Sequence, residues 1–408
     1  MSDLASRYRD VRAFTDALAA PLSAEDTVIQ SMPDVSPTKW HMAHTSWFFE
    51  TFVLARDADY TAHHPAYAVL FNSYYNTVGE QFPRAQRGLL SRPTLDAVRA
   101  YRAHVDAAMV SLLAAGVDAA TAAIVEVGLH HEEQHQELLL TDIKHVFSVN
   151  PLRPAYRARE TNSVEAPGCA WRSFDEGIRE IGARPGTGFT FDNEQPRHRV
   201  FLEAFALATR PVSNGDLIAF LEDGGYQTHS LWHSEGWATV QTEGWTAPFY
   251  WEKRDGRWFT MTLAGMQPVA LGEAACHLSW FEASAFAEWA GARLPTEAEW
   301  EVASAEAGSE GAFADDGRFH PAPLRAAGEG LTGMFGDTWE WTASPYVPYP
   351  GYRAAPGALG EYNGKFMANQ YVLRGGSCLT RRHHVRASYR NFFPSSARWQ
   401  MTGARLAR

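Results

Sequence analysis

Histidines at helical spacing are the residues of this chain with the most evident chemistry. His131 and His135 lie four residues apart in the run HHEEQHQELLLTDIKH, residues 130–145. On a helix both side chains emerge from one face, which also carries Ile124, Val127 and Leu138. The two imidazoles therefore lie on the stripe that should face the core of a helical bundle, where metal sites are built.

A third histidine, His44, lies on the apolar stripe of another segment, with Trp40, Trp47 and Leu54. A bundle buries such stripes against each other, so three imidazoles could meet in its core. The pair His229 and His233 has the same spacing as the first pair, so spacing alone is a weak signal. Three imidazoles suit several transition metals, and the pattern does not choose among them.

The same run matches a different metal chemistry. Residues His131-Glu132-x-x-His135 have the HExxH signature of zinc proteases, in which Glu132 would activate a zinc-bound water. However, no downstream histidine or glutamate forms an obvious third-ligand motif, and a bundle core is not a substrate cleft. A zinc metallohydrolase remains an alternative, as does a non-catalytic binding scaffold.

The elements that must position these residues fall into two parts of the chain that differ in composition. Only four of the 32 glycines and two of the 14 tryptophans lie in the first 150 residues. We expect a four-helix bundle over 1–150, a linker over 151–180, and a domain of short strands, turns and loops over 181–408. The expected bundle helices are 4–18, 38–54, 94–115 and 118–147, and the expected later helices are 214–222, 280–290 and 296–303. The long link 57–92 is rich in Tyr, His and Arg, which favours a functional loop.

The overall charge excludes some classes of partner. Lys and Arg total 36 against 47 Asp and Glu, a net charge of −11, so we expect neither nucleic acid nor a membrane surface as a partner. No apolar run approaches the ~18 residues of a membrane span, and MSDLASRYRD has no signal-peptide core. Cys169, Cys276 and Cys378 are few and far apart, so we expect no disulfide framework and a cytoplasmic location.

Several long motifs resemble one family along nearly the whole chain. They are SPTKWHMAHTSWFFETF (36–52), LFNSYYNTVGEQFPRAQRGLLSRPT (70–94), HHEEQHQELLLTDIKH (130–145), GARLPTEAEWEVA (291–303), GDTWEWTASPY (336–346), VLRGGSC (372–378) and YRNFFPSSARWQMTGARLA (389–407). Together they resemble the iron(II)-dependent sulfoxide synthases of ergothioneine biosynthesis. The resemblance implies an α+β chain, with a DinB-like four-helix bundle followed by a domain of the formylglycine-generating-enzyme (sulfatase-modifying factor) fold.

The resemblance also implies a reaction. His44, His131 and His135 match the family's three-histidine site for Fe(II), with O2 as co-substrate. The family couples the sulfur of a donor to C2 of the imidazole of hercynine (N-trimethylhistidine). Tyr74 and Tyr75 match a tyrosine pair from which, in one branch of the family, one phenol supplies a proton or hydrogen atom.

Residues for substrate binding follow from the same motifs. Gln134 matches a residue near the hercynine trimethylammonium, and Asn391 matches a contact to its carboxylate. Phe392 and Phe393 would form an aromatic wall, which suits a quaternary ammonium group. Arg84 and Arg87 are candidates for the donor, because guanidinium groups bind carboxylates.

The chain departs from the family pattern in one loop. Many sulfur-using relatives have Gly-Pro-Arg-His-Pro-Arg where this chain has Gly79-Glu80-Gln81-Phe82-Pro83-Arg84. The change should weaken recognition of an anionic donor such as γ-glutamylcysteine. Cysteine remains possible, as does a selenosugar, the donor of the related selenoneine synthases. Formylglycine-generating chemistry is not expected, because His383, not a cysteine, lies five residues after Cys378.

Overall fold

The computed structural model describes residues 4–159, 164–308, 310–326, 330–354 and 358–408. The chain forms two compact units, each made of two pieces of sequence. The first, here called the bundle unit, consists of Met1–Arg157 and Ala355–Tyr362; the second, the sheet unit, consists of Ala158–Ala354 and Asn363–Arg408. The described residues 358–362 therefore belong to the bundle unit, which the sequence did not indicate.

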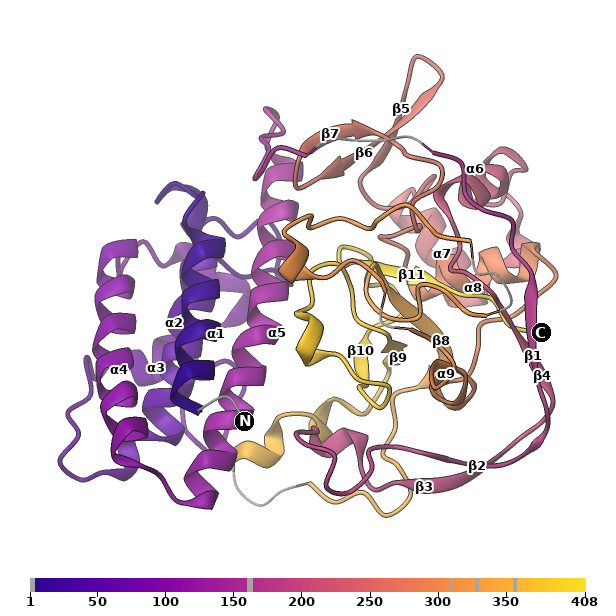
Figure 1. The fold of residues 1–408 in the computed structure, drawn as a ribbon. Helices are drawn as coiled ribbons and strands as arrows, with labels where there is room; N and C mark the ends of the chain where they lie inside the picture. The colour runs from indigo at the N-terminus through magenta and orange to yellow at the C-terminus, as the bar shows by residue number, and fades with distance from the viewer. Residues whose placement is uncertain (1–3, 160–163, 309, 327–329, 355–357) are drawn as a thin grey trace. The chain divides into compact units, whose positions relative to one another are not determined.

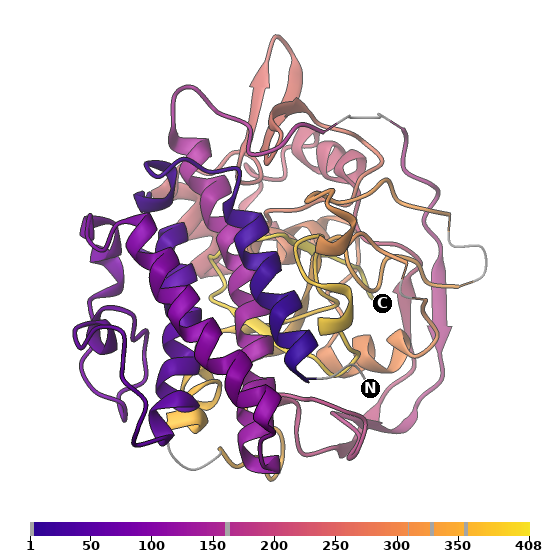
Figure 2. The same ribbon diagram turned by 60° about the vertical axis from the view of Figure 1, so that its left-hand side comes forward.

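Four long helices run side by side in the bundle unit (Figure 1, Figure 2). They are α1 (Leu4–Ala19), α2 (Thr38–Phe52), α4 (Leu95–Ala115) and α5 (Ala119–Val149). The expected helical bundle is thus confirmed, and side-chain caps explain where α4 and α5 start. The Thr94 hydroxyl accepts a hydrogen bond from the Ala97 N–H at 3.2 Å, and the Asp118 carboxylate accepts one from Thr121 N–H at 2.7 Å.

Helix α2 lies at the centre of the bundle unit, with 13 of its 15 residues buried. It approaches α5 closely at Gly128. A Cβ at this position would lie 2.5 Å from a ring carbon of Phe49 and 2.8 Å from one of Phe48. The missing side chain therefore allows the two histidine-bearing helices to pack against each other three residues before His131.

The connection between α2 and α4 contains η2 (Leu54–Arg56), the short α3 (Tyr67–Leu70) and η3 (Arg84–Leu89). Asn72 organises the loop that carries the two tyrosines. Its buried side-chain NH2 donates to the carbonyls of Tyr75, Gly79 and Glu80, and its Oδ1 accepts from the Tyr75 N–H at 3.1 Å. These bonds fix the backbone of a segment that has little regular secondary structure.

The sheet unit is built from short strands and helices. Its strands are β1 (Trp171–Phe174), β2 (Gly177–Ile181), β3 (His198–Leu202), β4 (Phe205–Ala208), β5 (Trp251–Arg254), β6 (Arg257–Thr262), β7 (Gly265–Pro268), β8 (Trp339–Pro345), β9 (Tyr371–Arg374), β10 (Asn391–Phe393) and β11 (Thr402–Ala404). They form the sheets β1-β4, β2-β3, β5-β6-β7 and β10-β9-β8-β11, and only the β11–β8 pair is parallel among the described strands. Strand β1 lies inside the segment 151–180 that we expected to be a linker.

Helices of the sheet unit are α6 (Asn214–Glu222), α7 (Ser234–Glu243), α8 (Trp280–Trp289) and α9 (Glu297–Ser304). The sequence indicated α6, α8 and α9, each of which begins with a capping box. It did not indicate α7, which has no side-chain cap and ends at Gly244 in a left-handed conformation.

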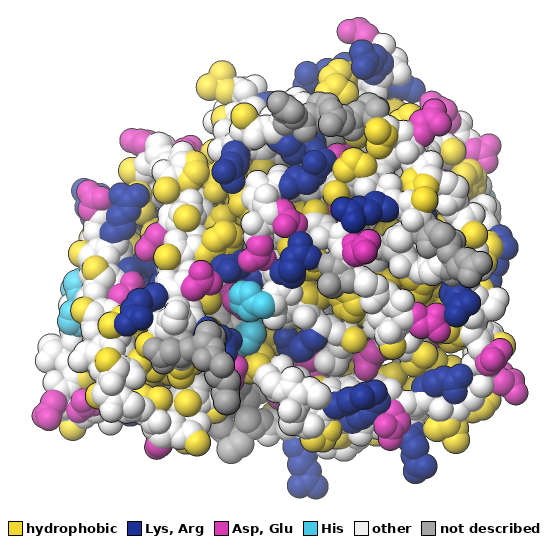
Figure 3. Space-filling view, in the orientation of Figure 1, with side chains coloured by type: hydrophobic (Ala, Val, Ile, Leu, Met, Phe, Trp, Pro, Cys, Tyr) yellow, Lys and Arg dark blue, Asp and Glu magenta, His cyan; other side chains and the backbone are white. Residues whose placement is uncertain are grey.

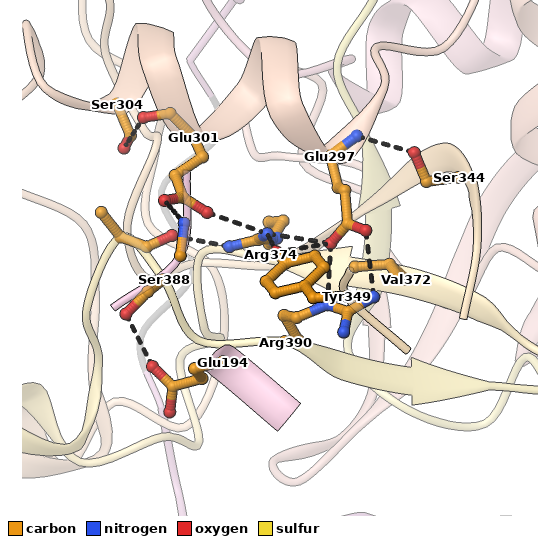
Figure 4. Close-up of polar contacts among 12 residues, drawn as sticks. Glu194, Glu297, Glu301, Ser304, Ser344, Tyr349, Val372, Arg374, Ser388 and Arg390 are labelled. Carbon is orange, nitrogen blue, oxygen red and sulfur yellow. Dashed lines mark hydrogen bonds and ion pairs between the residues drawn. The ribbon is translucent and has the colours of Figure 1, made fainter. Parts of the chain in front are cut away.

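A buried ionic network crosses the core of the sheet unit (Figure 4). Arg374 and Arg390 each donate to the Glu297 carboxylate at 2.9 Å, and Arg374 also lies 3.1 Å from Glu301. Both guanidinium groups are essentially inaccessible to solvent. Because Arg390 directly precedes Asn391, the network fixes the start of β10.

Charges on the molecular surface are mixed. Figure 3 shows Lys and Arg side chains interspersed with Asp and Glu on the face that it draws. Among the described residues, no helix has both the length and the apolar character that a membrane crossing needs.

Candidate metal centre

The three histidines on α2 and α5 meet in the interior of the bundle unit. His44, His131 and His135 each offer one ring nitrogen, and these atoms lie within 4.8 Å of one another. The Nε2 atoms of His44 and His131 are 3.1 Å apart. His44 and His131 are buried, and His135 is partly accessible.

All three imidazoles are held in the neutral form. Burial lowers the pKa of His131 to about 3. Burial, reinforced by the neighbouring His131, lowers the pKa of His44 and His135 well below the ordinary histidine value. The Nδ1–H of His44 donates to the Phe71 carbonyl at 2.6 Å, so its Nε2 keeps a free lone pair. Neutral rings with free lone pairs are the form that binds metals.

The spacing of these nitrogens fits a single metal ion. Two imidazole nitrogens that bind one ion at about 2.1 Å lie about 3.0 Å apart at a right angle and about 3.4 Å apart in a tetrahedron. The 3.1 Å between His44 and His131 falls within this range. A set of three imidazoles suits Fe(II) and Zn(II) alike.

Glu132 is engaged elsewhere, which argues against the zinc-hydrolase alternative. Its fully buried carboxylate accepts from Arg12 at 2.8 Å, Arg102 at 3.2 Å and the Thr15 hydroxyl at 2.7 Å. Burial raises the pKa of Glu132, but the two guanidinium groups outweigh burial and lower the pKa below its ordinary value. A carboxylate stabilised as an anion by two arginines of α1 and α4 is a poor general base. Glu132 of the HExxH match therefore has a structural role, because it connects α5 to α1 and α4.

Tyr74 and Tyr75 lie in the loop that Asn72 organises. Their rings stack with centroids 4.8 Å apart, and Tyr75 packs against Trp47 at 5.5 Å, which in turn stacks on His44 at 5.4 Å. Burial raises the pKa of both phenols. Both therefore carry their proton at neutral pH, and the Trp47 ring lies between Tyr75 and His44.

Tyr362 is a neighbour of the cluster that sequence reasoning missed. It belongs to the short segment 355–362 of the bundle unit. Its hydroxyl donates to Oε1 of Gln134, and its ring lies edge-on to His131 with centroids 5.7 Å apart. Only folding brings residues 134 and 362 together, so no local pattern could have indicated this contact.

The two loop arginines have different surroundings. Arg84 is exposed and donates to the Asp34 carbonyl. Arg87 is buried, lies 3.4 Å above the Trp40 ring and donates to the Ser36 hydroxyl at 2.9 Å, while its Nε has no hydrogen-bond partner among the described residues. Burial lowers the pKa of Arg87 to about 9, so it stays charged at neutral pH. A buried cation of this kind favours an anionic ligand.

The three C-terminal candidates lie on β10 in the sheet unit. Phe392 stacks on Tyr346 with centroids 4.0 Å apart, and Phe393 packs edge-on against Trp399 at 6.0 Å. The Asn391 side chain accepts from the Phe392 N–H at 2.8 Å. The two phenylalanines are partly exposed, so part of each ring is accessible.

The cysteines form no disulfide. Cys276 and Cys378 are buried, and Cys169 is exposed.

Comparison with known proteins identifies both units. Residues 7–139 match the DinB superfamily, and residues 173–328 and 319–408 match the sulfatase-modifying factor enzyme 1-like domain. A protein named hercynine oxygenase from Mycobacterium tuberculosis is 32% identical over 92% of this chain and 91% of its own length.

Two further relatives match less of the chain. A formylglycine-generating enzyme from Streptomyces coelicolor is 30% identical over 55% of this chain and 82% of its own length. The ergothioneine biosynthesis protein 1 of Schizosaccharomyces pombe is 26% identical over 54% of this chain and 28% of its own length. The extended match to hercynine oxygenase, in both units, shows that the chain belongs to the hercynine oxygenase family, the sulfoxide synthases of ergothioneine biosynthesis.

Proposed function

We propose that this chain is an iron(II)- and O2-dependent enzyme that couples a sulfur or selenium donor to C2 of the hercynine imidazole. For a thiol donor, the S–H and C2–H bonds break and a C–S bond forms. One oxygen atom of O2 becomes the sulfoxide oxygen, and the other leaves as water with the two hydrogens. O2 accepts all four electrons, so no further reductant is needed.

The observation that carries this proposal is the cluster of neutral histidines His44, His131 and His135. Iron(II) bound there would supply the redox chemistry that O2 activation requires. Three neutral protein ligands would leave the charge of the ion uncompensated and would leave coordination positions free for substrates. Family membership, rather than the donor set, favours iron over zinc.

Hercynine combines a quaternary ammonium, a carboxylate and an imidazole. Gln134 and the Tyr362 ring lie together beside His131, and an aromatic ring attracts a quaternary ammonium group. We assign these two residues to the trimethylammonium end. The resemblance assigns Asn391 to the carboxylate and Phe392 and Phe393 to the adjoining wall, and we keep these assignments as part of the proposal.

Arg87 is the best candidate for binding the donor. Its charge lies close enough to the histidines to help lower the pKa of His44 and His135. A donor carboxylate would compensate this buried cation, as cysteine and γ-glutamylcysteine could. Gln81 and Phe82 provide no charge for a second anionic group, which favours cysteine or an uncharged selenosugar over γ-glutamylcysteine. Arg84 is exposed and is therefore a weaker candidate for binding the donor.

Tyr74 and Tyr75 are proposed to supply the proton or hydrogen atom that favours coupling over simple oxidation of the donor. Both phenols are protonated at neutral pH because burial raises their pKa. We expect Tyr74→Phe or Tyr75→Phe to shift the product from the coupled adduct towards oxidised donor. An unchanged ratio of products in both variants would refute this role.

One competition experiment tests the proposed function. The protein is loaded anaerobically with Fe(II), mixed with hercynine, cysteine, γ-glutamylcysteine and a 1-selenosugar, and exposed to air. Mass spectrometry then identifies the adduct: its mass names the donor and separates sulfoxide synthesis from selenoneine synthesis. No adduct with any donor would contradict the proposal and favour a binding scaffold.

A pair of variants links the activity to the cluster. His131→Ala should lose Fe(II) binding and coupling together. His104→Ala, which removes an exposed histidine of α4, should keep both. Coupling retained in His131→Ala would show that the cluster is not the metal site.

A further inference from the structure

Each of the three clustered histidines has a second ring nitrogen, and the surroundings of these nitrogens differ. Nδ1 of His44 donates to a backbone carbonyl, that of Phe71. Nδ1 of His131 is buried and has no hydrogen-bond partner among the described residues. Nδ1 of His135 lies 2.8 Å from Nδ1 of His41, a residue with no role so far. Of these three nitrogens, only Nδ1 of His135 forms a hydrogen bond with another side chain in the part of the chain that the structure describes.

The tautomer of a neutral His41 ring follows from its other neighbour. Nε2 of His41 lies 3.0 Å from Oδ2 of Asp142, and the same oxygen accepts the Ser36 N–H at 2.8 Å. A carboxylate only accepts, so His41 Nε2 carries the proton. In a neutral ring Nδ1 is then the acceptor, and His135 donates its Nδ1–H to it. These two hydrogen bonds leave Nε2 of His135 without a proton.

Packing shields both His41 and Asp142 from water. His41 is 3% exposed and Asp142 is 4% exposed. His41 lies three residues before His44 on α2, and Asp142 lies seven residues after His135 on α5, so each pair shares a helix face. Trp40 packs against the rings of His41, His44 and His135, at centroid distances of 5.8, 4.6 and 6.1 Å.

We propose that His41, fixed by Asp142, is a positioning residue that orients His135 and keeps its Nε2 free to bind the metal. A partner of this kind fixes the tautomer and ring orientation of a ligand histidine and raises its basicity. The inference rests on the proposed metal centre, because His135 needs this orientation only as a ligand.

Two amide substitutions separate the two bonds of His41. In His41→Asn, the side-chain oxygen can take the place of Nδ1 and still accept from His135, but the contact with Asp142 is lost. In His41→Gln, the longer side chain can reach Asp142 in place of Nε2, but His135 loses its acceptor. A purely structural role would favour Gln, because it keeps the buried bond to a carboxylate. The positioning role favours Asn.

The experiment measures Co(II) binding to the full chain by competition with a chelator, together with the visible spectrum of bound Co(II). Circular dichroism sets a temperature at which both variants are folded. We expect His41→Gln to bind Co(II) about 10- to 100-fold more weakly than the wild type, with an altered spectrum, and His41→Asn to bind more tightly than His41→Gln. The control is Tyr101→Phe, which loses a buried hydrogen bond to Glu50 in the same bundle unit and should bind as the wild type does.

Equal affinities of the two amide variants, or tighter binding by His41→Gln, would overturn the inference. Loss of binding in both, with the control intact, would also overturn it, because His41→Asn keeps the acceptor. These outcomes differ from failure of the proposed function. That failure appears as a wild-type chain that binds no metal, or that binds it and forms no adduct.

Discussion

Replacing Glu132 by Gln separates a structural role of this residue from a catalytic one. The substitution keeps the size of the side chain but removes the negative charge between Arg12 and Arg102. The new amide can accept from one guanidinium group, while its NH2 opposes the other. Since Glu132 is fully buried, water cannot replace the lost interactions.

The remaining contacts of Arg12 and Arg102 determine how much the substitution lowers the free energy of unfolding. Breaking a buried ion pair by removing one partner costs about 3–5 kcal/mol. Arg12 also binds Asp106 at 2.7 Å and Arg102 binds Asp16 at 3.0 Å, so neither guanidinium is left without a carboxylate. We therefore expect a loss at the lower end, about 3 kcal/mol in the free energy of unfolding of the bundle unit. For about 160 residues this lowers Tm by roughly 6–12 °C.

Thermal unfolding followed by circular dichroism measures the loss, with Glu126→Gln as the matched control. Glu126 lies on the same helix and binds Arg7 at 2.9 Å, but about a third of each side chain is exposed. Such a pair contributes about 0–1 kcal/mol, so the control should shift Tm little. If Glu132→Gln unfolds like this control yet loses activity, Glu132 acts in the chemistry and the structural explanation is wrong.

Three further outcomes are expected. Gly128→Ala should lower the unfolding free energy by about 1–3 kcal/mol in urea titrations, because the new methyl group would collide with Phe49. Arg87→Met should raise KM for a carboxylate donor about 10- to 100-fold and leave KM for hercynine unchanged in steady-state assays. Burial raises the pKa of Glu273, but His320 and Arg159 outweigh burial and lower it to about 2. Stability from Glu273 is therefore present above about pH 4.5 and is lost as the pH falls towards 2, so Glu273→Gln should flatten the pH dependence of unfolding.

Helix positions were predictable because their signals are local. Thr94 and Asp118 cap α4 and α5, and α5 ends at Val149, directly before Asn150-Pro151. Periodic apolar residues likewise indicated that His44, His131 and His135 face one core. The sequence did not indicate α7 or any of the strand pairings, since short strands take their partners from distant residues.

The environment of the cluster was predictable only in part. His41 precedes His44 by three residues, so helical spacing alone could have placed it on the same face. Its role depends on Asp142, which lies 101 residues away and meets it only through the packing of α2 on α5. Tyr362 reaches the bundle unit through a separate piece of chain, and no spacing rule applies to it.

Glu132 shows why a short motif does not determine a reaction. Helical spacing puts His131 and His135 on one face. Glu132 directly follows His131, so its side chain points about 100° around the helix axis from that of His131. What that glutamate does depends on the helices it meets. Here Arg12 of α1 and Arg102 of α4 both bind the Glu132 carboxylate, which becomes the centre of a buried ionic network. In a cleft without these arginines, the same spacing would leave the glutamate free to act on water. Glu132→Gln and His131→Ala should therefore fail in different ways, the first in stability and the second in metal binding.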